Sequence, residues 1–290
     1  MERSWGVEES FAYTRWLAAS HYENFHVVSF LLPRHLHQDF QNVYAFCRWA
    51  DDLGDEIGDP TESLRLLDWW RCLTIAMYQG EARHPVLTAL RETVRRRELP
   101  SESFLDLIQA FIQDQRITHY ETLEQLLDYC RYSANPVGRL VLGLCGYHDS
   151  ERQQLSDRTC TALQLANFWQ DVSVDLEKDR IYLPQELLRK YGGSHQDVLD
   201  RQSTPAFRAA LAEAVGYARN LFLEGLPLAR MVDRRLSFDL ELFSRGGLKI
   251  LQKVESRDYD VLLTRPAIGK AERMALLVRT LIGWAFSRAA

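Results

Sequence analysis

The sequence predicts a single all-helical domain. Apolar residues recur with the period of a helix along nearly the whole chain, whereas the alternating pattern of strands is nearly absent. Of the 290 residues, 46% are hydrophobic and 11% aromatic, which is enough for a sizeable buried core. There is no internal repeat, no low-complexity tract and no linker long enough to separate domains. We therefore expect one domain over residues 1–290, built from about ten helices.

The helices expected in the first half of the chain are separated by proline and glycine. Pro33 ends an apolar segment that begins at residue 24, and Gly58-Asp59-Pro60 is a strong turn signal. Ser101, directly after Pro100, resembles an N-cap. The expected helices span residues 8–22, 36–56, 62–78, 85–98 and 101–113.

The second half continues in the same way. Pro136 should interrupt or kink the helix before it, and Gly192-Gly193 should break the chain. Gly246-Gly247 is a candidate kink, and residues 177–184 read as a loop. The expected helices span residues 123–132, 149–176, 204–223, 232–253 and 269–287, with a buried apolar segment at 139–146.

Charge and cysteine content exclude several classes of protein. The net charge of −5 and the pI near 5.9 give no basic footprint for nucleic acid. The five cysteines are scattered without a CxxC pair, so we expect reduced thiols and neither a disulfide framework nor a zinc site. No signal peptide opens the chain, and the longest uncharged run, residues 159–170, is too short to span a bilayer. We expect a cytoplasmic protein.

One helix carries polar residues in a stripe between apolar flanks. Gln164, Asn167, Asp171 and Asp175 step by three, four and four, which places them on one side of the helix expected over residues 149–176. We call these four residues the second polar row. Because apolar residues lie on both flanks, the row is predicted to point into a cavity walled by hydrocarbon.

A second segment repeats this design nearer the N-terminus. Tyr44, Arg48, Asp51 and Asp55 step by four, three and four, and form the first polar row. A solvated acidic helix face would explain either row alone. Two such rows, each with apolar flanks, instead predict one shared site for divalent cations.

Magnesium is the ion that this donor set favours. Mg²⁺ prefers oxygen ligands and commonly joins a few carboxylates to a substrate phosphate. The four aspartates and a diphosphate would be balanced by about three Mg²⁺ ions. No loop of EF-hand type indicates calcium. Arg48 and Arg180 are candidates for binding phosphate oxygens, with a salt bridge to the nearby aspartates as the alternative.

Aromatic residues near the rows suggest carbocation chemistry. Loss of diphosphate in an apolar cavity leaves a carbocation, which aromatic ring faces stabilise. Each of these rings is also explained by ordinary packing in the core. The candidates are Phe25, Tyr44, Trp49, Tyr129, Phe168 and Trp169.

These motifs resemble the squalene/phytoene synthase family, the head-to-head branch of the isoprenoid synthases. Residues 51–55 match its first aspartate motif, DxxxD, and residues 44–48 match the tyrosine and arginine before it. The second polar row, within 164–175, matches the second motif, and residues 180–184 match the loop after it. Residues 129–138 match a tyrosine-led motif that ends in Val-Gly. The resemblance implies an isoprenoid synthase (terpenoid synthase) fold with a central cavity.

Three features resemble the bacterial hydroxysqualene synthases of that family. They are residues 23–25, 133–139 and 167–171. Most of the family has Ala-Gly in place of Asn135-Pro136 and Arg in place of Gln170. This resemblance implies that presqualene diphosphate is ionised, rearranged and quenched with water to hydroxysqualene. The alternatives are a presqualene diphosphate, squalene or phytoene synthase that condenses two farnesyl or geranylgeranyl diphosphates, and a non-catalytic assembly factor.

The resemblance also implies roles for individual residues. Tyr44, Tyr129, Asp51 and Asp171 are the expected catalytic residues. The expected metal ligands are Asp51, Asp55, Asn167, Asp171 and Asp175. The expected substrate-binding residues are His21, Asn24, Phe25, Tyr44, Arg48, Gln164, Asn167, Arg180 and Tyr182.

The expected cofactor is Mg²⁺, without NADPH, since no dinucleotide-binding signature is present. Because a prenyl diphosphate partitions into bilayers, we expect loose contact with membranes and functional coupling to other enzymes of squalene synthesis.

Overall fold

The computed structural model describes residues 5–20 and 33–286, with side chains as far as residue 283. Within these ranges the chain forms helices and no strand, and a single isolated parallel bridge joins His119 to Ile181. The all-helical class is therefore confirmed. The chain forms two compact units: the first unit is Met1–Arg116 with Tyr132–Gln153, and the second is Ile117–Arg131 with Gln154–Ala290. The single domain over residues 1–290 stays a prediction, and each unit is described by itself.

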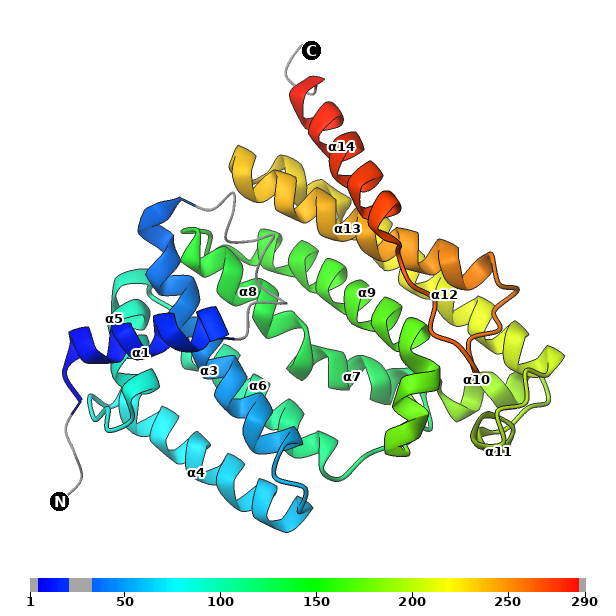
Figure 1. The fold of residues 1–290 in the computed structure, drawn as a ribbon, viewed down its shortest axis with the longest axis horizontal. Helices are drawn as coiled ribbons and strands as arrows, with labels where there is room; N and C mark the ends of the chain where they lie inside the picture. The colour runs from blue at the N-terminus through cyan, green and yellow to red at the C-terminus, as the bar shows by residue number, and fades with distance from the viewer. Residues whose placement is uncertain (1–4, 21–32, 287–290) are drawn as a thin grey trace. The chain divides into compact units, whose positions relative to one another are not determined.

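The first unit is built around α3. Helices α1 and α4 both pack against α3 and α5, and α6 packs against α3, α4 and α8 (Figure 1). The elements are α1 (Val7–Ser20), η2 (Arg34–Leu36), α3 (His37–Asp55), α4 (Pro60–Tyr78), α5 (Pro85–Arg97), α6 (Ser101–Asp114) and α8 (Asn135–Leu144).

The turn residues start the helices of the first unit largely as expected. The Asp59 carboxylate accepts a hydrogen bond from the Thr61 backbone N–H at 2.9 Å, and Pro60 occupies the first turn of α4. The sequence suggested Ser101 as the N-cap of α6, and this prediction is wrong. Pro100 takes that position because its extended backbone precedes the first helical residue, and no side chain caps this helix.

Aromatic packing forms the core of the first unit. The ring of Phe46 on α3 lies 5.5 Å from that of Trp70 on α4 and 4.9 Å from that of Phe104 on α6. All three side chains are buried. Because edge and stacked ring contacts stabilise beyond burial alone, this group fixes α3 against two neighbours and so fixes the direction of the first polar row.

The second unit contains the long helix α9 and a layer formed by α12, α13 and α14. Helices α12 and α13 pack side by side, and α14 packs on α13 (Figure 1). The last two residues of α7 and the first four of α9 belong to the first unit. The elements are α7 (Leu123–Ser133), α9 (Ser150–Asp175), η3 (Leu176–Lys178), α10 (Gln185–Lys190), α11 (His195–Leu199), α12 (Pro205–Gly225), η4 (Leu226–Arg230), α13 (Arg234–Glu255) and α14 (Lys270–Phe286).

Two expected interruptions turned out differently. At Pro136 the break is confirmed, since α7 ends at Ser133 and α8 begins at Asn135. At Gly246-Gly247 α13 instead runs on as one helix. A Cβ atom on Gly247 would lie 2.2 Å from the ring of Phe222 on α12, so this glycine allows two helices to approach closely.

A search of the described helices for a membrane-crossing segment found none with the required combination of length and apolar character. All five cysteines are free, as expected.

Candidate active site

The first polar row lies on α3, in the first unit. Its four residues belong to one helix of 19 residues, so the spacing does place them on one side. The Arg48 guanidinium forms ion pairs with Asp51 at 3.2 Å and with Asp52 and Glu56 at 2.5 Å each. Of the two roles that the sequence left open for Arg48, the structure contains the salt bridge to neighbouring carboxylates.

Burial and crowding make this row a place where negative charge is costly. Burial raises the pKa of Asp51, the nearby Arg48 guanidinium lowers it, and the charges of Asp55 and Asp52 raise it further. Burial also raises the pKa of Tyr44, and the charges of Asp51 and Asp52 add to the effect. A cation at this row would relieve the repulsion among the carboxylates.

The second polar row lies on α9, in the second unit. Gln164, Asp171 and Asp175 are half-buried, whereas Asn167 is exposed. The Arg265 guanidinium donates to both oxygens of Asp171, with Nε to Oδ1 and with Nη2 to Oδ2 at 3.1 Å. The Asp171 side chain is only 16% exposed, so this paired arrangement is a charge-assisted contact at the edge of the interior.

Asp175 holds its proton more tightly than an ordinary aspartate. Burial and the negative charge of Asp171 raise the pKa of Asp175 to about 7, against the lowering effect of Arg180, Lys178 and Arg265. Arg180 therefore lies close enough for its charge to lower the pKa of this carboxylate, and its binding of phosphate oxygens stays a prediction. Three cations do not fully offset burial and repulsion at the second polar row.

Aromatic side chains of the second unit cluster beside the second polar row. Phe168, next to Asn167 on α9, stacks on Tyr182 with ring centroids 3.7 Å apart. Tyr129 of α7 lies 6.1 Å from both rings, and Tyr120 lies 5.6 Å from Tyr182. All four are buried, so in the structure they form a packed cluster. Roles for Tyr129 in cation chemistry and for Tyr182 in substrate binding stay predictions.

The loop after α9 is held in place by backbone hydrogen bonds. The Ile181 N–H donates to the Thr118 carbonyl at 2.8 Å, and the Gln185 N–H donates to the Tyr120 carbonyl at 2.9 Å. These bonds position Tyr182 in the aromatic cluster.

The donors of each row fit a hard divalent cation that shares its ligands with a phosphate. Among the described residues, no three His, Cys, Asp or Glu side chains come together as a metal site. Mg²⁺ does not require such a cage, because it keeps waters and binds through one or two carboxylates plus substrate phosphates. The raised pKa values of Asp51 and Asp175 indicate that both rows would gain from added positive charge.

Not every expected site residue can be placed. His21, Asn24 and Phe25 lie outside the described residues. The two rows belong to different units, so their convergence on one cavity stays a prediction.

Arg265 is a residue of this site that the sequence pattern does not reveal. It follows α13 in the segment that leads to α14, and its partner Asp171 lies 94 positions away. A neighbouring contact fixes the same segment, since the Gln170 side-chain amide donates to the Pro266 carbonyl at 2.6 Å. An isolated arginine before a proline gives no periodic signal, so only its position in the tertiary structure identifies it.

The fold and these motifs together are those of a class of enzymes that act on prenyl diphosphates. The family described as squalene/phytoene synthase matches residues 18–272, and the chain belongs to this family. Its members are enzymes of the prenyltransferase type, and the isoprenoid synthase fold expected from the sequence is confirmed.

Individual relatives narrow the comparison. The squalene synthase HpnC from Alicyclobacillus acidocaldarius, known from a crystal structure, is 46% identical in sequence to this chain. The match covers 88% of this chain and 96% of the HpnC chain, and the two structures superpose with a TM-score of 0.84. A hydroxysqualene synthase of Rhodopseudomonas palustris is 33% identical over 81% of this chain and 80% of the relative. A phytoene synthase of Thermus thermophilus is 32% identical over 92% of this chain and 91% of the relative.

Proposed function

We propose that this protein is a Mg²⁺-dependent hydroxysqualene synthase, which converts presqualene diphosphate and water into hydroxysqualene and diphosphate. The observation that carries the proposal is the similarity to hydroxysqualene synthases, among them that of Rhodopseudomonas palustris at 33% identity over 81% of the chain. The Asn135-Pro136 pair and Gln170 support the same subgroup. In the structure, Asn135 and Pro136 form the start of α8, and Gln170 is buried with its amide bonded to the Pro266 carbonyl.

In this reaction the carbon–oxygen bond of presqualene diphosphate breaks and the electron pair leaves with diphosphate. The cyclopropylcarbinyl cation then rearranges, and water adds and gives up a proton to form the C30 alcohol. The aspartates of both polar rows would hold Mg²⁺, which would stabilise the negative charge that develops on the leaving diphosphate.

The residues of the chain bind the diphosphate, position the substrate and exclude water. Arg48, Arg180 and Arg265 supply cations beside the two rows, and each would exchange part of its contact with an aspartate for a phosphate oxygen. The cluster of Tyr129, Phe168 and Tyr182 would present ring faces and apolar surface to the cation. This surface would keep water away until the rearrangement is complete.

A second candidate within the family is condensation of two prenyl diphosphates. The phytoene synthase of Thermus thermophilus, at 32% identity, and a presqualene diphosphate synthase of Rhodopseudomonas palustris, at 29%, favour it. The two candidates use the same metal-assisted loss of diphosphate and differ in the substrate that is ionised.

Product analysis separates these candidates. Purified protein with MgCl₂ is incubated separately with presqualene, farnesyl and geranylgeranyl diphosphate, and the products are identified by mass spectrometry. We expect hydroxysqualene and free diphosphate from presqualene diphosphate alone. Unchanged presqualene diphosphate together with phytoene or presqualene diphosphate from the shorter substrates would establish the second candidate instead.

Matched variants test whether both rows act on the reaction. Asp51→Asn in the first unit and Asp171→Asn in the second should each lower kcat/KM by about two orders of magnitude or more, while the far-ultraviolet circular dichroism stays unchanged. Asp68→Asn and Asp128→Asn, at exposed ion pairs of α4 and α7, are the controls and should retain activity. Near-normal turnover in the Asp51 or Asp171 variant would remove that row from the mechanism.

A non-catalytic assembly factor is the third reading. It predicts no turnover of any of the three diphosphates and no Mg²⁺-dependent binding of diphosphate by calorimetry.

A further inference from the structure

Helix α14 presents an apolar face to solvent. Met274, Val278, Leu281 and Ile282 are 60%, 44%, 42% and 52% exposed. At 3.6 residues per turn these positions fall along one side of the helix. Thr280, on another side, is fully buried, and α14 packs there against α13. The side chains that normally drive a helix into a core therefore point away from the body of the second unit.

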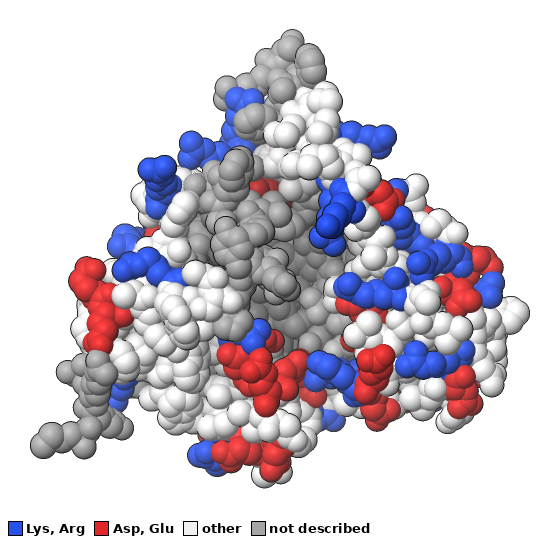
Figure 2. Space-filling model, in the orientation of Figure 1, with Lys and Arg blue, Asp and Glu red and all other residues white. Residues whose placement is uncertain are grey.

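Cations border this apolar face on both sides. By helical position Lys270 lies along one edge and Arg279 along the other, and both are exposed. Figure 2 shows uncharged surface over α14 with Lys and Arg side chains around it. An apolar helix face bordered by Lys and Arg is the pattern of helices that lie in the interface of a membrane.

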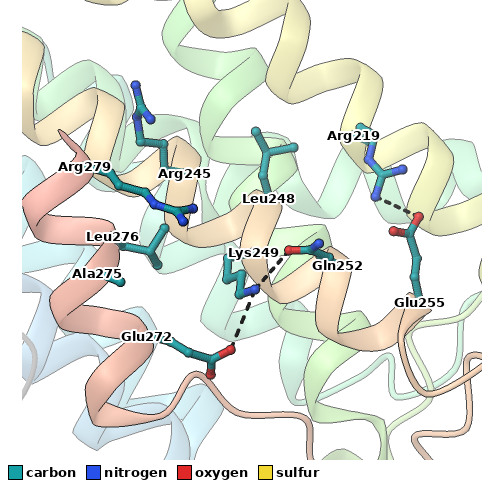
Figure 3. A pocket seen from close by; sticks show the side chains of 10 residues that line it. All are labelled: Arg219, Arg245, Leu248, Lys249, Gln252, Glu255, Glu272, Ala275, Leu276 and Arg279. Carbon is teal, nitrogen blue, oxygen red and sulfur yellow. Dashed lines mark hydrogen bonds and ion pairs between the residues drawn. The ribbon is translucent and has the colours of Figure 1, made fainter. Parts of the chain in front are cut away.

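A cleft of about 570 Å³ opens beside the same face, between α13 and α14 and reaching α12 (Figure 3). Its charged lining residues are Arg219, Arg245, Lys249, Arg279, Glu255 and Glu272. Arg219 pairs with Glu255 at 2.7 Å, and Lys249 lies 3.7 Å from Glu272. Arg279 reaches from α14 toward α13 and has no ion pair with any described residue, so the cleft keeps an excess of positive charge.

We propose that the α14 surface, meaning the apolar face of Met274, Val278, Leu281 and Ile282 with its bordering cations and the cleft, docks on a bilayer that contains anionic phospholipids. The apolar side chains enter the boundary between headgroups and acyl chains. Arg279 and its neighbours in the cleft bind lipid phosphate oxygens, which a guanidinium pairs with well.

Charge favours a bilayer over a second copy of the chain as the occupant. Two copies joined through this face would bring the same cations close to one another, which disfavours association. An anionic lipid surface is complementary to both the apolar and the cationic part of the face. The biological use of the contact rests on the proposed function, because a prenyl diphosphate dissolved in the bilayer would reach the enzyme from that surface.

Vesicle sedimentation tests the proposal without any substrate. The full chain is mixed with vesicles of phosphatidylcholine alone, or of equal parts phosphatidylcholine and phosphatidylglycerol, and the bound fraction is measured. We expect binding to the anionic vesicles that weakens as salt is raised, because the cationic contribution is screened. A failure here would leave turnover of a detergent-dispersed substrate intact, so it is distinguishable from failure of the proposed function.

Variants at exposed positions identify the face. Leu281→Glu should weaken binding by about tenfold or more, and Arg279→Gln by about fivefold. The matched controls are Leu223→Glu on α12, an apolar residue that is 52% exposed, and Arg189→Gln on α10, a cation that is 65% exposed. Both controls should bind as the wild type does, and circular dichroism checks that each variant is folded.

Three results would overturn the proposal. They are no binding of the wild type to anionic vesicles, equal binding of Leu281→Glu and the wild type, or a wild-type dimer that Leu281→Glu dissociates in analytical ultracentrifugation. The last would assign the face to a second copy of the chain.

Discussion

Asp239 provides a quantitative test of the electrostatics of the second unit. Asp239 lies on α13 and is 2% exposed, and neither of its carboxylate oxygens has a hydrogen-bond partner among the described residues. Burial raises the pKa of Asp239 from 3.8 to about 7, and the negative charge of Asp233 adds to the effect. The folded protein therefore holds a proton on this side chain over a pH range in which the unfolded chain has lost it.

This difference makes the free energy of unfolding depend on pH with a definite sign. Between pH 3.8 and about 7 the folded state binds more protons than the unfolded state, so stability falls as pH rises. The two pKa values differ by about 3 units, and at about 1.4 kcal/mol per unit the contribution is about 4 kcal/mol. It is fully present below pH 3.8 and lost as pH rises through about 7.

Asp239→Asn removes the charge while keeping the shape of the side chain. At pH 8 the free energy of unfolding of the variant should be about 3 kcal/mol higher than that of the wild type. This is the contribution of about 4 kcal/mol from the lost charge, less about 1 kcal/mol for amide hydrogens that lack a partner. At pH 4 it should be about 1 kcal/mol less stable than the wild type. Urea unfolding followed by circular dichroism at both pH values measures the two differences.

Asp39→Asn is the matched control at a buried carboxylate whose partners are present. Asp39 accepts hydrogen bonds from Thr93 at 2.9 Å, from Arg97 at 2.8 Å and from Arg96. This substitution should lower the free energy of unfolding at pH 8 by about 3 kcal/mol, since it breaks a buried ion pair. If Asp239→Asn instead failed to stabilise the protein at pH 8, or changed stability equally at pH 4 and pH 8, the reasoning from the unpaired carboxylate would be refuted.

Three further predictions follow from the site and the packing. Arg265→Gln should tighten Mg²⁺ binding in the absence of diphosphate by about fivefold, because Asp171 loses a competing cation; weaker binding in calorimetry would contradict this. Gly247→Ala should lower the free energy of unfolding by about 1–3 kcal/mol, since its Cβ would lie 2.2 Å from Phe222, whereas the same change at Gly246, with open space around it, should raise it by about 0.5–1 kcal/mol; equal melting shifts in both would disprove the packing argument. Removal of divalent cations with EDTA should abolish turnover of presqualene diphosphate and added MgCl₂ should restore it; turnover that persists in EDTA would exclude the metal role.

The long helices were predictable because their signals are local. Helix α9 (Ser150–Asp175) was expected over residues 149–176, and α3 (His37–Asp55) over residues 36–56. Apolar periodicity over several turns, with proline or glycine at the ends, is enough to locate such elements. The short helices α10 and α11, of 6 and 5 residues, were not expected, because one or two turns are too short to show a period.

The candidate site likewise has features that local spacing predicts and contacts that it does not. Within each polar row the residues share one helix, so their common side follows from spacing alone. The pairing of Arg265 with Asp171 and the stacking of Phe168 on Tyr182 join separate elements, and no local pattern encodes them. The sequence also predicted a kink at Gly246-Gly247, where the glycines instead lie within a continuous helix beside Phe222.

The sequence by itself determined the helical class, the two polar rows and the family, because periodicity and motif spacing are properties of neighbouring residues. Only the tertiary structure decided which cations neutralise the rows, which carboxylates are buried, and which face of α14 stays exposed. Those outcomes depend on contacts between residues far apart in the chain. Burial and unlike charges act through space, so the same aspartate is ordinary or strongly perturbed according to what the fold places beside it.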